Sequence, residues 1–165
     1  MQILLETSSA WFPIFTLLLG SLFGAFSSII PAALIDSRRN RTQAKRLMKA
    51  LQTEVVSLMQ IIDKRHYLSS LSDCITALNS DPTPVPFCIN IPQHYSRVFQ
   101  ANLDNIGLLR DPFLTHLLTF HQLIDAAVQD VKPGGVIAGG GSRDDFLELQ
   151  SVITHALAVG KTLTE

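Results

Sequence analysis

Charged side chains are scarce in this chain, at 16% of its 165 residues, whereas apolar residues make up 47%. So low a charge content is unusual for a soluble globular domain and indicates a segment that faces lipid. Cysteine is scarcer still, since Cys74 and Cys88 are the only two. Two isolated cysteines exclude a disulfide framework and a zinc cluster, so both are expected to be ordinary thiols.

Sequence motifs of catalysis and cofactor binding are also missing. The chain contains no HExxH, P-loop or GxSxG pattern, and its five histidines are scattered without a metal-ligand spacing. The one glycine-rich stretch, residues 134–141, lacks the lysine of a phosphate cradle and precedes Asp144 and Asp145, which would repel an anion. We expect this stretch to be a mobile loop. The sequence therefore predicts no enzyme activity, no cofactor and no metal site.

One long segment, residues 11–35, contains no charged side chain and exceeds the ~20 residues that a transmembrane helix needs. A cleavable signal peptide would begin with basic residues and end at a small-residue cleavage site. Here the only charge in the leader is Glu6, and Arg38 and Arg39 follow as a stop-transfer signal. We therefore predict an uncleaved transmembrane helix over residues 11–35.

A basic block directly follows this segment, whereas beyond residue 50 acidic residues outnumber basic ones. The positive-inside rule then predicts a single-pass protein of the cell inner membrane, with residues 1–10 outside and residues 36–165 as a cytoplasmic domain. The basic side chains are expected to contact anionic lipid headgroups, and nucleic acid is the less favoured partner. They are Arg38, Arg39, Arg41, Lys45, Arg46 and Lys49.

Small residues recur at every fourth position of the predicted transmembrane helix and include a GxxxG motif. They fall on one helix face, where small side chains let two helix backbones approach closely in lipid. This stripe predicts a homo-oligomer, although glycine and alanine are also simply common in membrane helices. The residues of the stripe are Thr16, Gly20, Gly24, Ser28 and Ala32.

Apolar spacings of three and four residues beyond the anchor predict an all-α domain, a bundle of about four helices. The first helix is expected over residues 36–79, with a break near His66 to Ser70 and with a seam at Met48, Leu51, Val55, Leu58 and Ile62. Four prolines then interrupt the helical pattern between residues 81 and 92, so this part is expected to be an extended segment.

Three further helices are predicted from their end signals. The second begins at Pro92 and ends before Gly107, and the third begins at Asp111-Pro112 and ends at Val131. Ser142 and Asp145 resemble a capping box at the start of the fourth. The seam of this fourth helix consists of Phe146, Leu149, Ile153, Ala156, Gly160 and Leu163.

A stretch within the domain, HYSRVFQANLDNIGLLRDPFLTHLLTFHQLIDAAVQ, resembles small uncharacterised bacterial proteins that have one N-terminal membrane helix and a cytoplasmic helical domain. In that pattern an aromatic helix ends in an IGLL-like turn, here Ile106 to Leu109, and a second helix follows. The resemblance implies packing roles for Phe99, Leu103, Ile106 and Leu108 and a bacterial source. By analogy of architecture alone, some such proteins act as effectors in antiphage defence.

These features together predict a non-enzymatic membrane-anchored protein that acts by self-association and by binding a protein partner at the inner membrane face. A ligand-gated membrane effector, whose cytoplasmic domain senses a small messenger and whose anchors disturb the bilayer, is the first alternative. A membrane-tethered enzyme is the second. Ligand-induced stabilisation would distinguish the effector from a passive adaptor.

Overall fold

The computed structural model describes the backbone of residues 11–165 and the side chains of Leu17 and residues 37–165. This part of the chain contains helices and turns, and its one β-bridge, between Val85 and Gly141, is isolated. The predicted all-α class is therefore confirmed. The chain divides into two units, the first ending at Gln43 and the second covering Ala44–Glu165, and the packing below is that of the second unit. The helices are α1 (Trp11–Lys64), α2 (Tyr67–Ser80), α3 (Arg97–Ala101), the 3-10 helix η1 (Leu103–Leu108), α4 (Phe113–Val131) and α5 (Arg143–Thr164).

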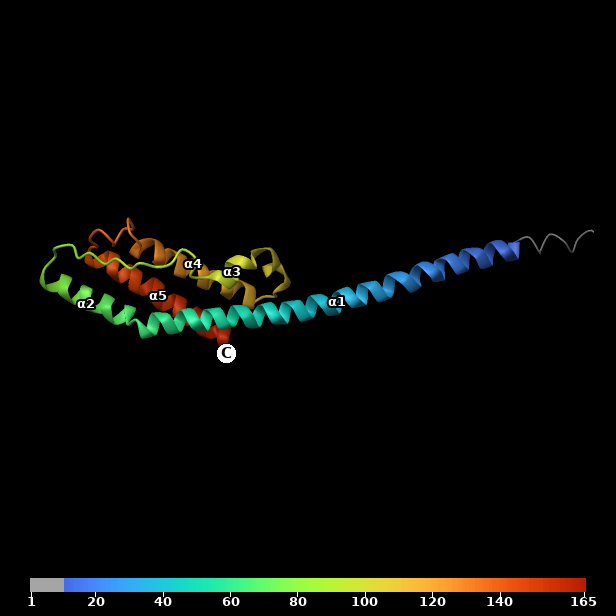
Figure 1. Cartoon of the computed structure of the whole chain (residues 1–165), viewed down its shortest axis with the longest axis horizontal. Coiled ribbons are helices and arrows are strands. Elements are labelled where there is room, and N and C mark those ends of the chain that lie inside the picture. The colour runs from blue at the N-terminus through green and yellow to red at the C-terminus, as the bar shows by residue number, and fades with distance from the viewer. Residues whose placement is uncertain (1–10) are drawn as a thin grey trace, which may run out of the picture. The chain divides into compact units, whose positions relative to one another are not determined.

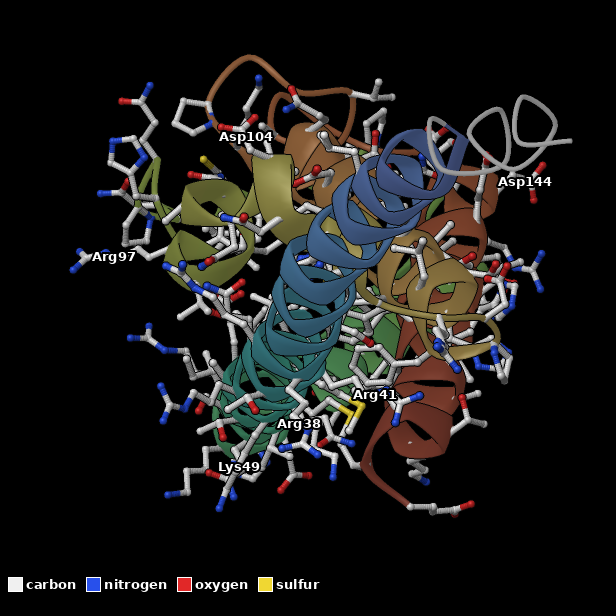
Figure 2. The ribbon with its side chains drawn as sticks, turned by 90° about the vertical axis from the view of Figure 1, so that its right-hand side faces the viewer. Arg38, Arg41, Lys49, Arg97, Asp104 and Asp144 are labelled. Atoms are coloured by element: carbon white, nitrogen blue, oxygen red, sulfur yellow. The ribbon has the colours of Figure 1, made fainter. Side chains whose placement is uncertain are left out.

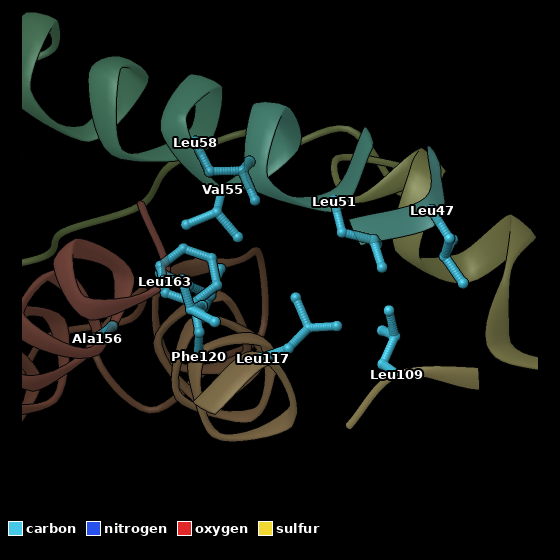
Figure 3. Packing of buried hydrophobic residues seen from close by; sticks show 10 residues of the cluster. Leu47, Leu51, Val55, Leu58, Leu109, Leu117, Phe120, Ala156 and Leu163 are labelled. Atoms are coloured by element: carbon cyan, nitrogen blue, oxygen red, sulfur yellow. The ribbon is translucent and has the colours of Figure 1, made fainter. Parts of the chain in front are cut away.

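The apolar seam of α1 forms one side of the core (Figure 3). Leu51 and Val55 are fully buried and pack with side chains of α4 and α5, among them Phe120. The predicted seam is correct at Leu51, Val55 and Leu58 but wrong at its first position, where Met48 is exposed and Leu47 is buried instead. A helix turns by 3.6 residues, so Leu47, four residues before Leu51, lies on the same face.

The predicted break in the first long helix is confirmed at the start of the expected interval. α1 ends at Lys64, α2 begins at Tyr67, and His66 between them has a left-handed backbone conformation with φ 54°. Ser69 and Ser70 were expected to weaken the helix, but their hydroxyls donate hydrogen bonds to the carbonyl of His66 at 2.9 and 3.1 Å. They thus support the first turn of α2.

The last helix follows its sequence pattern closely. Ser142 and Asp145 form the predicted capping box, in which the amide of Ser142 donates to the carboxylate of Asp145 at 2.8 Å. α5 packs along α4, and α2 packs on α5 (Figure 1). All six residues of the predicted α5 seam are buried, namely Phe146, Leu149, Ile153, Ala156, Gly160 and Leu163.

The proline-rich part of the chain is non-helical over residues 81–96, which we call the strap. Val85 and Gly141 exchange two backbone hydrogen bonds, and the amides of Phe87 and Ile89 donate to the carbonyls of Ile137 and Val131. These bonds hold the first half of the strap in the extended form that the sequence predicts. Residues 90–95 make no backbone–backbone hydrogen bond within the described part of the chain.

The predicted second helix, from Pro92 to Ile106, is wrong in length. The chain forms only the short α3 and the 3-10 helix η1, which meet at Asn102. The side-chain amide of Asn102 donates to the carbonyl of Val98 at 2.8 Å. Asparagine often competes for backbone groups in this way and disfavours a helix interior. Leu103, expected to point inward, is half exposed.

The glycine-rich loop of residues 134–141 is packed, which corrects the expectation of a mobile loop. Ile137 within it is only 1% exposed and joins a core cluster with Phe146. A Cβ atom on Gly135 would lie 2.3 Å from the carbonyl oxygen of Gln129, so only glycine fits there. Gly135 therefore permits a close backbone approach, a role that composition alone does not distinguish from mobility.

No helix within the described part of the chain is long and apolar enough to cross a membrane. The predicted external tail, residues 1–10, lies outside the described residues. The same holds for nearly all side chains of the predicted transmembrane segment, including the whole small-residue stripe of Thr16, Gly20, Gly24, Ser28 and Ala32. The anchor and its self-association stay predictions.

Candidate functional site: an apolar cavity beside the strap

A cavity of about 590 Å³ lies in the second unit. Its lining comes from α1 between Ala50 and Ile62, from Arg65 just after α1, from residues 87–98 of the strap and α3, and from the inner face of α4. The start of α2 and Ile153 of α5 complete it. Cavities of 300–1,000 Å³ with mainly apolar walls are typical binding sites for small ligands, and this one has both properties.

Two hydroxyl groups on the α1 wall of the cavity are already bonded within the helix. Thr53 donates to the carbonyl of Lys49 at 2.9 Å and Ser57 to that of Thr53 at 2.8 Å, so these hydroxyls are satisfied within the helix. On the same wall Ile61 is 49% exposed. An exposed isoleucine beside a cavity is apolar surface that a bound ligand could cover.

One buried carboxylate shapes the far end of the cavity. Glu54 is 9% exposed and accepts two backbone hydrogen bonds, from the amide of Val98 at 2.6 Å and from that of Phe99 at 2.9 Å. These amides belong to the first turn of α3, where N–H groups lack partners within the helix. Glu54 thus fixes α3 on α1 and closes this end, and its two oxygens are already engaged.

The remaining polar groups of the lining lie near its rim. Tyr95 donates its hydroxyl to the carboxylate of Asp125, and burial raises the pKa of that carboxyl. Arg97 donates from Nε to the carbonyl of His94 at 3.2 Å, and its side chain is directed away from the ribbon (Figure 2). Arg65, at the end of α1, lines the cavity and forms no ion pair with any described residue.

A buried histidine lies close to this site but does not line it. His121 of α4 is 2% exposed, and its ring stacks on Phe99 with 3.8 Å between ring centroids. Neither ring nitrogen has a hydrogen-bond partner among the described residues. Burial lowers the pKa of His121 from 6.5 to about 4, so the ring is neutral at pH 7.

The cavity can bind but offers little chemistry. The described residues contain no group of three histidine, cysteine or acidic side chains that could hold a metal ion. The buried Glu54 is bound by backbone amides, and the hydroxyl of Ser57 in the lining donates to the carbonyl of Thr53. Both cysteines are free; Cys88 is exposed on the strap, and burial raises the pKa of Cys74, which disfavours its reactive thiolate.

The predicted lipid-contact residues do not belong to this cavity. All six of them, Arg38, Arg39, Arg41, Lys45, Arg46 and Lys49, are exposed on α1. None of them forms an ion pair with a described residue. Figure 2 shows the side chain of Lys49 directed away from the ribbon. Such unpaired, exposed charges are available to an anionic surface. Their contact with lipid stays a prediction.

Sequence reasoning missed the residues that shape the cavity, among them Glu54, Arg65 and Tyr67. Glu54 carried a usable signal, because its position between Leu51 and Leu58 places an acid on the buried face of α1. A buried acid requires partners, and this requirement points to a second element packed on that face. Arg65 and Tyr67 gave no such signal. They lie on either side of His66, and only the turn there brings both to the cavity.

No protein-family model, curated protein or solved structure matches the chain. The resemblance of residues 94–129 to small bacterial membrane proteins therefore stays a prediction, and so does a bacterial source. What the chain does has to be argued from its own residues.

Proposed function

We propose that this chain is a non-enzymatic, membrane-anchored protein whose helical domain binds a small apolar ligand. The observation that supports this function is the cavity of about 590 Å³ beside the strap. Its apolar walls suit a ligand that water dissolves poorly, and binding there would remove Ile61 and its neighbours from water.

The cavity favours the ligand-gated alternative over the passive adaptor that the sequence alone put first. An adaptor needs a broad exposed surface for its partner, whereas an open apolar cavity with exposed wall residues such as Ile61 leaves apolar side chains in water until something fills it. Residues 90–95 of the strap make no backbone–backbone hydrogen bond within the described chain and are held by side-chain bonds such as that of Tyr95 to Asp125, which suits a wall that opens for entry. Self-association of the anchors remains the proposed output of ligand binding.

The anchor in this proposal is residues 11–35, with the N-terminus outside and the domain in the cytoplasm. Its supports are the uncharged length of the segment and the basic residues that follow it, all of them exposed. The small-residue stripe from Thr16 to Ala32 would join the anchors of several copies. A protein partner at the inner membrane face would respond to this association.

Thermal unfolding of the full chain in lipid nanodiscs tests ligand binding, with octan-1-ol as an apolar probe. We expect the unfolding midpoint to rise with probe concentration, because a ligand that binds only the folded state stabilises it. Ser57→Phe places a ring in the cavity from an exposed helical position and should remove the effect. Thr76→Phe, on the exposed face of α2 away from the cavity, is the matched control and should respond like the parent. An equal response from Ser57→Phe would show that the probe acts elsewhere.

A further inference from the structure

The charged residues that line the cavity differ in whether they already have a binding partner. Glu54 is its one acidic residue, and both its oxygens accept backbone hydrogen bonds. The two guanidinium groups of the lining, those of Arg65 and Arg97, have no carboxylate partner among the described residues. The charge left for a ligand to neutralise is therefore positive.

The two arginines lie at different ends. Arg97 precedes Val98, whose amide binds Glu54, so Arg97 shares its end of the cavity with a carboxylate. Arg65 follows Glu54 by eleven positions and lies directly after the end of α1, which places the two about 16 Å apart along the helix axis. Besides Arg65, the α1–α2 junction contributes the phenol of Tyr67 to the lining. This end lacks an acidic lining residue and can receive an anion.

Between these ends the lining is apolar and elongated. The α1 residues that line it run from Ala50 to Ile62, a length of about 18 Å at 1.5 Å per residue. A cavity of about 590 Å³ has room for one alkyl chain with its head group. Leu58, Ile124 and Val128 lie along this part of the lining.

We infer that the cavity binds an amphiphile with a single alkyl chain and an anionic head group. The head group, a carboxylate or a phosphate monoester, lies at Arg65 and Tyr67, and the chain extends toward Leu58 and Ile124. This inference rests on the proposed function, since it names the class of ligand for the same cavity. A guanidinium group binds both kinds of head group with paired hydrogen bonds.

Calorimetric titration of the full chain in nanodiscs, corrected with empty nanodiscs, compares four probes with eight-carbon chains, the carboxyl carbon of octanoate included. They are octanoate, octyl phosphate, octan-1-ol and octyltrimethylammonium. We expect the two anions to bind about tenfold more tightly than the alcohol, because a hydrogen bond to a charged group contributes that much affinity. Decanoate should bind about fifteenfold more tightly than octanoate, since each of its two additional buried methylenes contributes just under fourfold.

Two matched variants locate the head group. Arg65→Gln should reduce the affinity for octanoate and octyl phosphate to that for octan-1-ol and leave the alcohol unchanged. Arg97→Gln removes the other guanidinium group of the lining and should keep the preference for anions. A higher affinity for one anion than for the other supports the inference and identifies the head group.

Different results would overturn the inference of an anionic ligand and the proposed function of apolar ligand binding. Saturable binding of the alcohol with no preference for anions would overturn the inference and leave the proposed function intact. So would tighter binding of the ammonium probe, or loss of the preference in Arg97→Gln but not in Arg65→Gln. No saturable binding of any probe would overturn both.

Discussion

His121 is a titratable side chain in a place where neither of its ring nitrogens finds a partner. It is stacked on Phe99 and lies edge-on to Phe120, so its surroundings are aromatic and apolar. Such surroundings disfavour the imidazolium form, which is why the pKa falls to about 4. A histidine of this kind lowers the stability of the fold in acid.

The pH dependence of stability should therefore contain a contribution from His121. In the unfolded chain the ring takes up a proton near pH 6.5, and in the folded chain only near pH 4. Above pH 6.5 His121 does not lower the free energy of unfolding. As the pH falls toward 4 this free energy decreases, by about 3 kcal/mol in total. His121→Phe should remove this fall and stabilise the fold at pH 5. Urea unfolding at several pH values checks it, and equal slopes for parent and variant between pH 4 and 6.5 would contradict it.

Gly135 gives a second test at the scale of one residue. A Cβ atom there would lie 2.3 and 2.4 Å from two backbone carbonyl oxygens, those of Gln129 and Asp130. Backbone cannot yield as a flexible side chain does, so Gly135→Ala should lower the unfolding free energy by about 2 kcal/mol. Gly139→Ala is the matched control, because a Cβ on Gly139 meets nothing within 4 Å. A loss of equal size in both variants would show that the loop, and not the contact, is responsible.

At the scale of elements, the sequence predicted α5 well because all its signals were local. The capping box fixes its start, and one uninterrupted spacing of threes and fours marks its buried face. α3 and η1 were missed because Asn102 ends a helix that the apolar spacing alone would continue. The cavity could not be predicted, since its lining joins residues of α1, the strap and α4 that only the fold brings together.

The membrane segment is the element whose role most needs an experiment. If the stripe from Thr16 to Ala32 joins helices in lipid, Gly24→Ile should weaken association by about 1–2 kcal/mol while insertion persists, because a bulky side chain holds the helix axes apart. A bacterial membrane reporter carrying residues 8–38 measures this. Leu22→Ile, off the stripe, is the control and should change little. If Gly20→Ile and Gly24→Ile both associate like the parent, any oligomer is held by another part of the chain.

At the scale of the whole molecule, the orientation of the anchor decides where the domain works. The basic residues after position 37 predict a cytoplasmic domain. A reporter fused after Glu165 that is active only in the cytoplasm should give a signal, and one active only outside should not. The opposite result would reverse the orientation and place Cys74 and Cys88 in an oxidising compartment.

The central claim is that the cavity beside the strap is a binding site for a single-chain anionic amphiphile. Native mass spectrometry of the full chain, purified from cells in nanodiscs, tests it most directly. We expect one such molecule bound per chain in the parent and in Thr76→Phe, and none in Ser57→Phe, because the introduced ring should fill the cavity at a lining position. The same bound molecules in the parent and in Ser57→Phe, or none in the parent, would contradict it.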